Sequence, residues 1–280
     1  MNSQKKHFYP AALTIAGSDS GGGAGIAADL RTFNALGVFG CCAITAVTSQ
    51  NPASVSRIDP VPAEGVAAQI KAVTDKISIA YAKTGMLFSR ETVLAVVNEI
   101  KRCALKIVCD PVMVSTSGSV LLKEDAIETM KSELFPLAKW ITPNIPEAEL
   151  ILGTKISGVD DMFEAALTLS NTYKTSVLLK GGHLKSDNIC DAVAKDGKVY
   201  LLSSPQLEVP PFASHGTGCT LSAALAAALA LDFPWKRAIC ESKAFVFGSL
   251  SQCVEIGKNV YAMYPPVEDS LPLIKLSLVE

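Results

Sequence analysis

The chain has 280 residues, a formal net charge of −2, 49% hydrophobic residues and 19% charged residues. This balance predicts a globular protein with a large core and excludes an intrinsically disordered chain. Because the lysines and arginines are scattered singly, the sequence has no basic cluster that would bind a phosphate backbone. We therefore expect no nucleic-acid partner.

The cysteines and the N-terminal region bear on the cellular compartment. None of the eight cysteines forms a Cys-x-x-Cys pair, and the three histidines are isolated, so we expect reduced thiols. Polar and glycine residues interrupt the first apolar run before a signal-peptide core could form. The Ala/Leu-rich stretch 221–231 is far shorter than the ~20 residues of a membrane span. We therefore expect a cytoplasmic protein without a membrane anchor.

Apolar strand-like runs alternate with helical patterns along nearly the whole chain. We predict strands at 11–16, 41–48, 79–84, 107–109, 140–142 and 176–179. Helices are predicted at 26–36, 62–76, 91–101, 123–133, 146–152 and 160–173. The strands lack a period of two, which is typical of a mostly parallel sheet covered on both faces.

The last third of the sequence predicts a hairpin followed by two long helices. The hairpin pairs 192–194 with 199–202 through Asp196-Gly197, a sequence suited to a type I′ turn. The helices are expected at 218–231 and 235–256, separated at Pro234. Since we find neither a linker nor an internal repeat, residues 1–280 are predicted to form a single domain.

The first predicted strand runs into a glycine-rich loop at residues 17–25. Such a loop lets the backbone approach a ligand, although a flexible turn is the simpler interpretation. It lacks the Gly-Lys-Ser/Thr ending of a Walker A motif. A dinucleotide site would need an acidic residue about 20 positions on, but the second strand ends in Thr48-Ser49-Gln50-Asn51. The Gln50 amide suits a heteroaromatic edge, since it offers a donor beside an acceptor.

A second glycine loop, residues 214–220, leads directly into a helix. Gly216 and Gly218 permit a tight turn whose N–H groups, with the helix dipole, could stabilise a transferring phosphoryl group. Cys219 would lie in the first helical turn, where thiol pKa values are lowered, and could take a proton from an attacking hydroxyl. Tight packing against an Ala-rich helix is the alternative interpretation of these small residues.

Further polar residues follow other predicted strands. Asp110 at a buried strand end requires a partner or a metal. Asn144 and Glu147 could steer a hydrated Mg²⁺, but a helix capping box explains the same pair. Lys180 precedes two glycines and could reach nucleotide phosphates, although exposed lysines are equally common. We interpret His183 and His215 as hydrogen-bonding loop residues rather than catalysts.

Seven motifs in order give the chain a resemblance to a known family: AGSDSGGGAGIAADL, TAVTSQN, KTGML, DPVM, TPNIPEAE, LLKGGH and HGTGCTLSAA. Over residues 11–257 the sequence resembles the hydroxymethylpyrimidine/phosphomethylpyrimidine kinases of thiamine biosynthesis, within the ribokinase-like superfamily. The resemblance implies a three-layer α/β/α fold and phosphoryl transfer from ATP to 4-amino-5-hydroxymethyl-2-methylpyrimidine and its monophosphate. It also implies a homodimer. The tail, residues 258–280, matches no motif.

The resemblance further implies roles for individual residues. Gly17, Asp29, Gln50, Met86 and Val112 would line the substrate pocket. Magnesium and phosphates would be organised by Asp110, Asn144 and Glu147, directly or through water, with Lys180 and Thr217 near ATP. The amides of Gly216, Thr217 and Gly218 would form an anion hole, and Cys219 would be the base. Cys rather than Asp at position 219 favours the pyrimidine kinases over the sugar kinases. Two alternatives stay open, namely a pyridoxine/pyridoxal kinase and a non-catalytic vitamin sensor.

Overall fold

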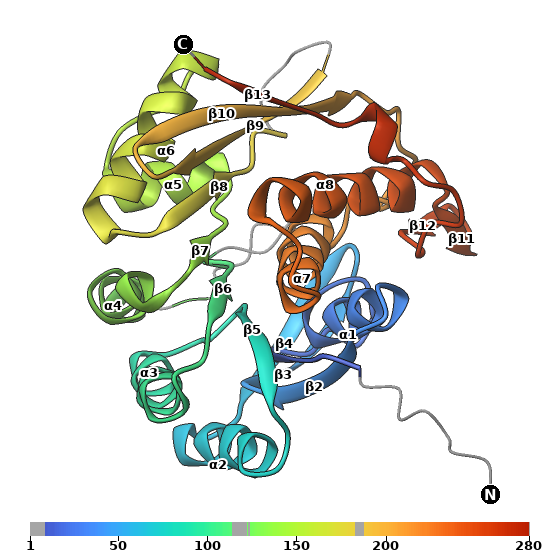
Figure 1. Ribbon diagram of the computed structural model, residues 1–280. Coiled ribbons are helices and arrows are strands. Elements are labelled where there is room, and N and C mark those ends of the chain that lie inside the picture. Colours follow the sequence, from blue (N-terminus) through green and yellow to red (C-terminus); the bar gives the residue numbers. More distant parts are fainter. Residues whose placement is uncertain (1–8, 114–121, 123, 183–187, 280) are drawn as a thin grey trace, which may run out of the picture.

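The computed structural model describes residues 9–113, 122, 124–182 and 188–279, and within them nine strands form one sheet (Figure 1). The strand order is β13-β10-β9-β8-β7-β6-β5-β1-β2. The bounds of these strands are β1 Ala11–Ala16, β2 Phe39–Ile44, β5 Ile79–Thr84, β6 Ile107–Cys109, β7 Trp140–Ile141, β8 Ser176–Leu179, β9 Asn188–Lys195, β10 Lys198–Pro205 and β13 Lys275–Leu278. Two small hairpins lie outside it: β3 Ala46–Asn51 with β4 Ser54–Pro60, and β11 Val254–Gly257 with β12 Val260–Ala262.

The strands from β2 through β1, β5, β6 and β7 to β8 pair in parallel, whereas β9, β10 and β13 continue the sheet antiparallel. Every residue of β1, β6, β7 and β8 is buried, which explains why these strands show no alternation of apolar and polar residues. Asp196 and Gly197 both have positive φ, 52° and 73°, and this confirms the predicted type I′ turn between β9 and β10.

Helices cover both faces of the sheet and form the outer two of three layers (Figure 1). Their bounds are α1 Gly25–Ala35, α2 Ala63–Thr74, α3 Arg90–Cys103, α4 Glu124–Thr129, α5 Ile145–Leu152, α6 Val159–Tyr173, α7 Thr217–Ala230 and α8 Trp235–Ser251. A π-helical turn, Met130–Leu134, continues α4, and 3₁₀ turns occupy Phe135–Leu137 and Leu271–Leu273. Helices α2 to α6 pack on one face, and α1, α7 and α8 pack on the other.

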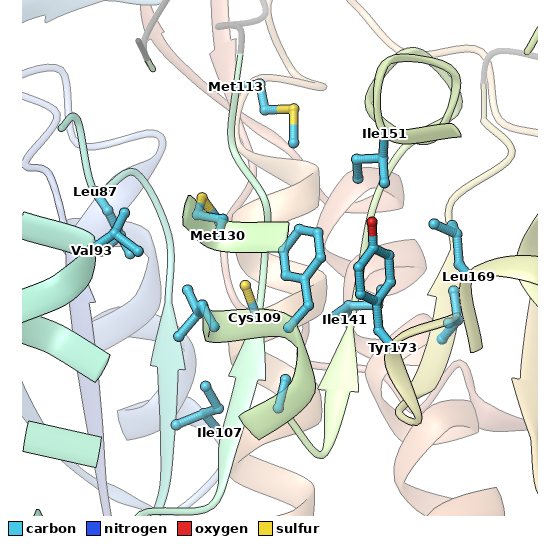
Figure 2. Packing of buried hydrophobic residues seen from close by; sticks show 14 of the residues in the cluster. Leu87, Val93, Ile107, Cys109, Met113, Met130, Ile141, Ile151, Leu169 and Tyr173 are labelled. Atoms are coloured by element: carbon cyan, nitrogen blue, oxygen red, sulfur yellow. The ribbon is translucent and has the colours of Figure 1, made fainter. Parts of the chain in front are cut away.

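The larger core lies between the sheet and helices α2 to α6. Ile107 and Cys109 of β6 and Ile141 of β7 face Met130 and Tyr173 there (Figure 2). The rings of Phe135 and Tyr173 meet edge to face with their centroids 5.1 Å apart. Each fully buried large apolar side chain contributes about 1.5–3 kcal/mol relative to exposure, so this core fixes the sheet that carries the site.

The structure departs from the predicted elements at three places. The strand predicted at 41–48 is two strands, because the Thr45 N–H donates to Ala16 O and its hydroxyl to Met86 O, which turns the chain out of the sheet. The last long helix ends at Ser251 rather than at residue 256. Val254–Gly257 forms strand β11 instead, and the chain turns back at Asn259, whose φ is 57°. The unmatched tail supplies β13, an edge strand paired with β10.

No helix in the described part of the chain combines the length and apolar character needed to cross a membrane.

Candidate active site

A cavity of about 510 Å³ lies at the carboxyl ends of the parallel strands. The predicted site residues that line it are Gly17, Gln50, Met86, Asp110, Val112, Asn144, Glu147, Lys180, Gly216, Thr217, Gly218 and Cys219. Gln50 and Cys219 therefore share one cavity although 169 positions separate them in the sequence. Parallel strands bring such distant loops together because all their carboxyl ends meet at one edge of the sheet. His183 lies outside the described residues.

Asp29 is the one predicted site residue that does not line this cavity. It lies on α1, is fully buried, and its carboxylate accepts from Lys83 Nζ at 2.9 and 3.0 Å and from Thr14 Oγ1 at 2.6 Å. Asp29 is thus paired with a buried ammonium group and does not line the cavity, and its role in substrate binding stays a prediction. Sequence reasoning missed Lys83, which does line the cavity. A lysine near the end of the predicted strand 79–84, as in KTGML, was the available signal.

The Cys219 thiol lines the cavity, but its pKa is not lowered as predicted. Burial raises the pKa of Cys219 to about 11, and the nearby carboxylates of Asp29 and Asp110 add to the rise. The Lys83 ammonium and the Gly25 N–H oppose this effect without cancelling it. The prediction considered only the helix N-terminus, whereas the tertiary structure adds desolvation and negative charge.

The second glycine loop forms the N-terminus of α7 as predicted. Gly216 is the N-cap with φ 83°, a conformation that favours glycine, and a Cβ atom there would collide with the Gly23 carbonyl. The Thr217 N–H already donates to Ser214 O at 3.2 Å. Among the described residues, the N–H groups of Gly216, Gly218 and Cys219 have no backbone acceptor, so they are the amides available to an anion.

Asp110 finds the partner that its burial requires. Its carboxylate accepts from Lys180 Nζ at 2.8 Å and from Ser222 Oγ at 3.1 Å. Burial opposes ionisation, but Lys180 and Lys83 outweigh it and hold the pKa of Asp110 below its ordinary value. The site therefore contains a charged carboxylate beside an ammonium group that could contact a nucleotide phosphate.

Asn144 and Glu147 form the capping box that was the alternative to a metal role. Asn144 Oδ1 accepts from the Glu147 N–H at 2.9 Å, and Glu147 Oε2 accepts from the Asn144 N–H at 2.8 Å. Both residues still line the cavity. Burial raises the pKa of Glu147 to about 7, with Asp110 as a further cause, although Lys180 opposes the rise. A nearby cation would stabilise the ionised form of this buried carboxylate.

The described residues contain no cluster of three or more His, Cys, Asp or Glu side chains that could hold a metal. A hydrated Mg²⁺ keeps several waters and requires only one or two carboxylates together with substrate phosphates. Glu147 and Asp110 line the cavity, and their carboxylate oxygens are ligands of the kind that this requirement names.

The two glycine loops are joined by a hydrogen bond between His215 and Asp19. His215 Nε2 lies 2.8 Å from Asp19 Oδ2, and Asp19 also accepts from the N–H groups of Gly21 and Ala24 at 2.8 and 2.9 Å. This confirms His215 as a hydrogen-bonding loop residue. Its carboxylate partner, 196 positions away, was beyond the reach of sequence spacing.

Comparison of the chain with known proteins identifies its family. The family model described as phosphomethylpyrimidine kinase matches residues 19–264. The chain belongs to the phosphomethylpyrimidine kinase family. A hydroxymethylpyrimidine/phosphomethylpyrimidine kinase from Rhizobium meliloti is 44% identical over 251 residues, covering 89% of this chain and 94% of the relative. The corresponding protein from Bacillus subtilis is 40% identical over 250 residues, covering 89% and 92%.

Solved structures of a phosphomethylpyrimidine kinase and of pyridoxal kinases confirm the ribokinase-like α/β fold. A phosphomethylpyrimidine kinase from Clostridium difficile has a TM-score of 0.75 and 40% identity, covering 85% of this chain and 98% of its own. An ADP complex of a Bacillus subtilis pyridoxal kinase has a TM-score of 0.84 and 34% identity, covering 92% and 98%. A Staphylococcus aureus pyridoxal kinase in complex with AMP-PCP and pyridoxal has a TM-score of 0.87 and 29% identity, covering 98% and 100%.

Proposed function

We propose that this protein is an ATP-dependent hydroxymethylpyrimidine/phosphomethylpyrimidine kinase of thiamine biosynthesis. Membership of the phosphomethylpyrimidine kinase family supports the reaction class and ATP as co-substrate. The observation that carries the proposal is the single cavity shared by the Gln50 amide, the free amides of α7 and Cys219. This arrangement suits a flat heteroaromatic alcohol bound opposite a nucleotide. We further propose that the enzyme is a cytoplasmic homodimer.

The chain's own residues would divide the work as follows. Gln50 reads the aminopyrimidine edge, and Gly17, Met86 and Val112 surround the ring. The hydroxymethyl oxygen attacks the γ-phosphorus in line, so a new O–P bond forms and the bond to the ADP oxygen breaks. The hydroxyl proton passes to the Cys219 thiolate. This thiolate is scarce at neutral pH but strongly basic, because its pKa is about 11.

Charge on the transferring group is balanced by groups that are fixed before the substrate binds. The N–H groups of Gly218 and Cys219 point from the positive end of α7, and Lys180 adds a full positive charge. Glu147 and Asp110 would hold Mg²⁺ through water, with Asn144 fixing Glu147 by the capping box. When bound, the ion would neutralise phosphate charge. Lys83 would stabilise the Cys219 thiolate, and Asp29 would hold Lys83 in place.

A pyridoxal kinase is the second candidate, because pyridoxal kinases of the same fold cover nearly the whole chain. Pyridoxal also carries a hydroxymethyl group on a flat heteroaromatic ring. The higher identity to pyrimidine kinases, 40–44% against 29–34%, favours the pyrimidine substrate.

A coupled assay of ADP release tests the proposal. The panel contains hydroxymethylpyrimidine, its monophosphate, pyridoxine and pyridoxal, and we expect the highest kcat/KM for the first. Higher kcat/KM for pyridoxal would transfer the assignment to the second candidate, and no ADP release with any alcohol would leave a vitamin sensor. We expect Cys219→Ala to lower kcat about 10²–10⁴-fold with little change in ATP affinity. Cys253→Ala, outside the cavity, is the matched control.

A further inference from the structure

The Gln50 carboxamide is held between two side chains on the cavity wall. Its Oε1 lies 3.2 Å from Thr48 Oγ1, and its Nε2 lies 3.5 Å from His215 Nε2. The two ends of a carboxamide have nearly the same size, so rotation by 180° about the terminal bond exchanges them without a steric change. The protons carried by the two neighbours therefore decide which end belongs on which side.

Thr48 can only accept a hydrogen bond from Gln50. A hydroxyl has one proton, and Thr48 Oγ1 lies 2.7 Å from Ser18 O, a carbonyl that can only accept. This shorter contact takes the proton and leaves the Thr48 oxygen lone pairs facing Gln50. An amide oxygen at that position would meet another acceptor, whereas an amide NH₂ would donate to it.

His215 Nε2 cannot accept a hydrogen bond from Gln50. This nitrogen lies 2.8 Å from Asp19 Oδ2, and Asp19 is ionised because two backbone N–H groups and His215 stabilise its charge. A carboxylate requires a proton on the facing ring nitrogen. A protonated Nε2 has no lone pair for an amide NH₂, and the positive end of its N–H, which donates to Asp19, favours an amide oxygen beside it. His215 thus leads to the same orientation as Thr48, from the opposite end of the amide.

We infer that the Gln50 amide is oriented with its NH₂ group toward Thr48 and its oxygen toward His215, and that these two positioning residues set the direction in which a substrate edge is read. The inference rests on the proposed function. It leaves one amide proton on the Thr48 side and one oxygen lone pair on the His215 side for the ligand. The ring edge must then place its donor toward His215 and its acceptor toward Thr48.

A fixed amide distinguishes two pyrimidines of almost identical shape. The 4-amino compound offers an exocyclic N–H donor beside the N3 acceptor. The 4-oxo analogue, 5-hydroxymethyl-2-methylpyrimidin-4(3H)-one, offers a carbonyl acceptor beside an N3–H donor, so its order is reversed. A site whose polar groups are fixed rejects the reversed order, because both pairs of groups would then face like with like.

The test compares kcat/KM for the 4-amino and 4-oxo compounds. We expect the wild-type ratio to be at least about 100. In His215→Met the amide is free to rotate, and the ratio should fall at least about 10-fold, while His215→Gln, which restores an N–H donor, should recover it. Thr48→Val should lower the ratio likewise, with Thr48→Ser as its matched control. A role confined to folding would lower both kcat/KM values together and leave their ratio unchanged.

Several results would overturn the inference. An unchanged ratio in folded His215→Met and Thr48→Val, with thermal melting near that of the wild type, would refute it and leave the proposed function intact. If one variant fails to fold, the other decides. A wild-type enzyme that uses both compounds equally would also refute it. A wild-type enzyme that phosphorylates neither pyrimidine would refute the proposed function, and the inference with it.

Discussion

The state of the Cys219 thiol can be measured by its alkylation as the pH is changed. With a pKa of about 11, the thiolate fraction at pH 8 is about 10⁻³, against roughly 0.2 for an unperturbed cysteine of pKa ~8.5. The fraction alone would slow the reaction about 200-fold. A more basic thiolate is also more nucleophilic, with a Brønsted slope of about 0.4–0.5, so a net slowing of roughly 20-fold is expected.

Pulse alkylation with iodoacetamide between pH 7 and 10, followed by mass spectrometry of the peptide that contains Cys219, gives this rate separately from the other seven cysteines. In the folded protein the logarithm of the rate should rise with a slope near 1 and show no plateau. The urea-unfolded chain is the control and should level off above about pH 9. A plateau below pH 8.5 in the folded protein would show that the helix N-terminus outweighs burial and the two carboxylates.

Three further predictions concern groups around the cavity. Lys83→Met should lower the free energy of unfolding in urea by about 3–5 kcal/mol, because the buried Asp29 carboxyl loses its cation, and the double variant with Asp29→Leu should recover most of the loss. Equal losses in both variants would contradict this account. Gly216→Ala should reduce turnover at least about 10²-fold by forcing the glycine loops apart, whereas Gly158→Ala, which meets open space, should keep full activity. Asp19 has a lowered pKa, so it stabilises the fold above about pH 4 and loses this contribution as the pH falls; the stability gap between wild type and Asp19→Asn should therefore narrow toward pH 3, and a constant gap would refute it.

The sequence by itself determined the sheet, its helices and most of the site. Buried parallel strands read as continuous apolar runs, and glycine loops at strand ends are local features, so β1, β6, β8 and the N-terminus of α7 could be predicted from short segments. The set of cavity residues followed from resemblance to the family, and all but Asp29 line the cavity. The prediction extended the last helix into Val254–Gly257, which forms a strand, because the helical pattern before it is long.

Only the tertiary structure decided the protonation states and the charge pairs of the site. Three features of the site depend on groups that lie far away in the sequence. These are the pKa of Cys219, the ion pair of Asp29 with Lys83, and the hydrogen bond between Asp19 and His215. Desolvation and Coulomb interactions depend on distance in space, and a linear sequence does not contain those distances. Residue types and local propensities therefore predicted which side chains meet at this sheet edge, while their protonation and orientation emerged from how the loops pack together.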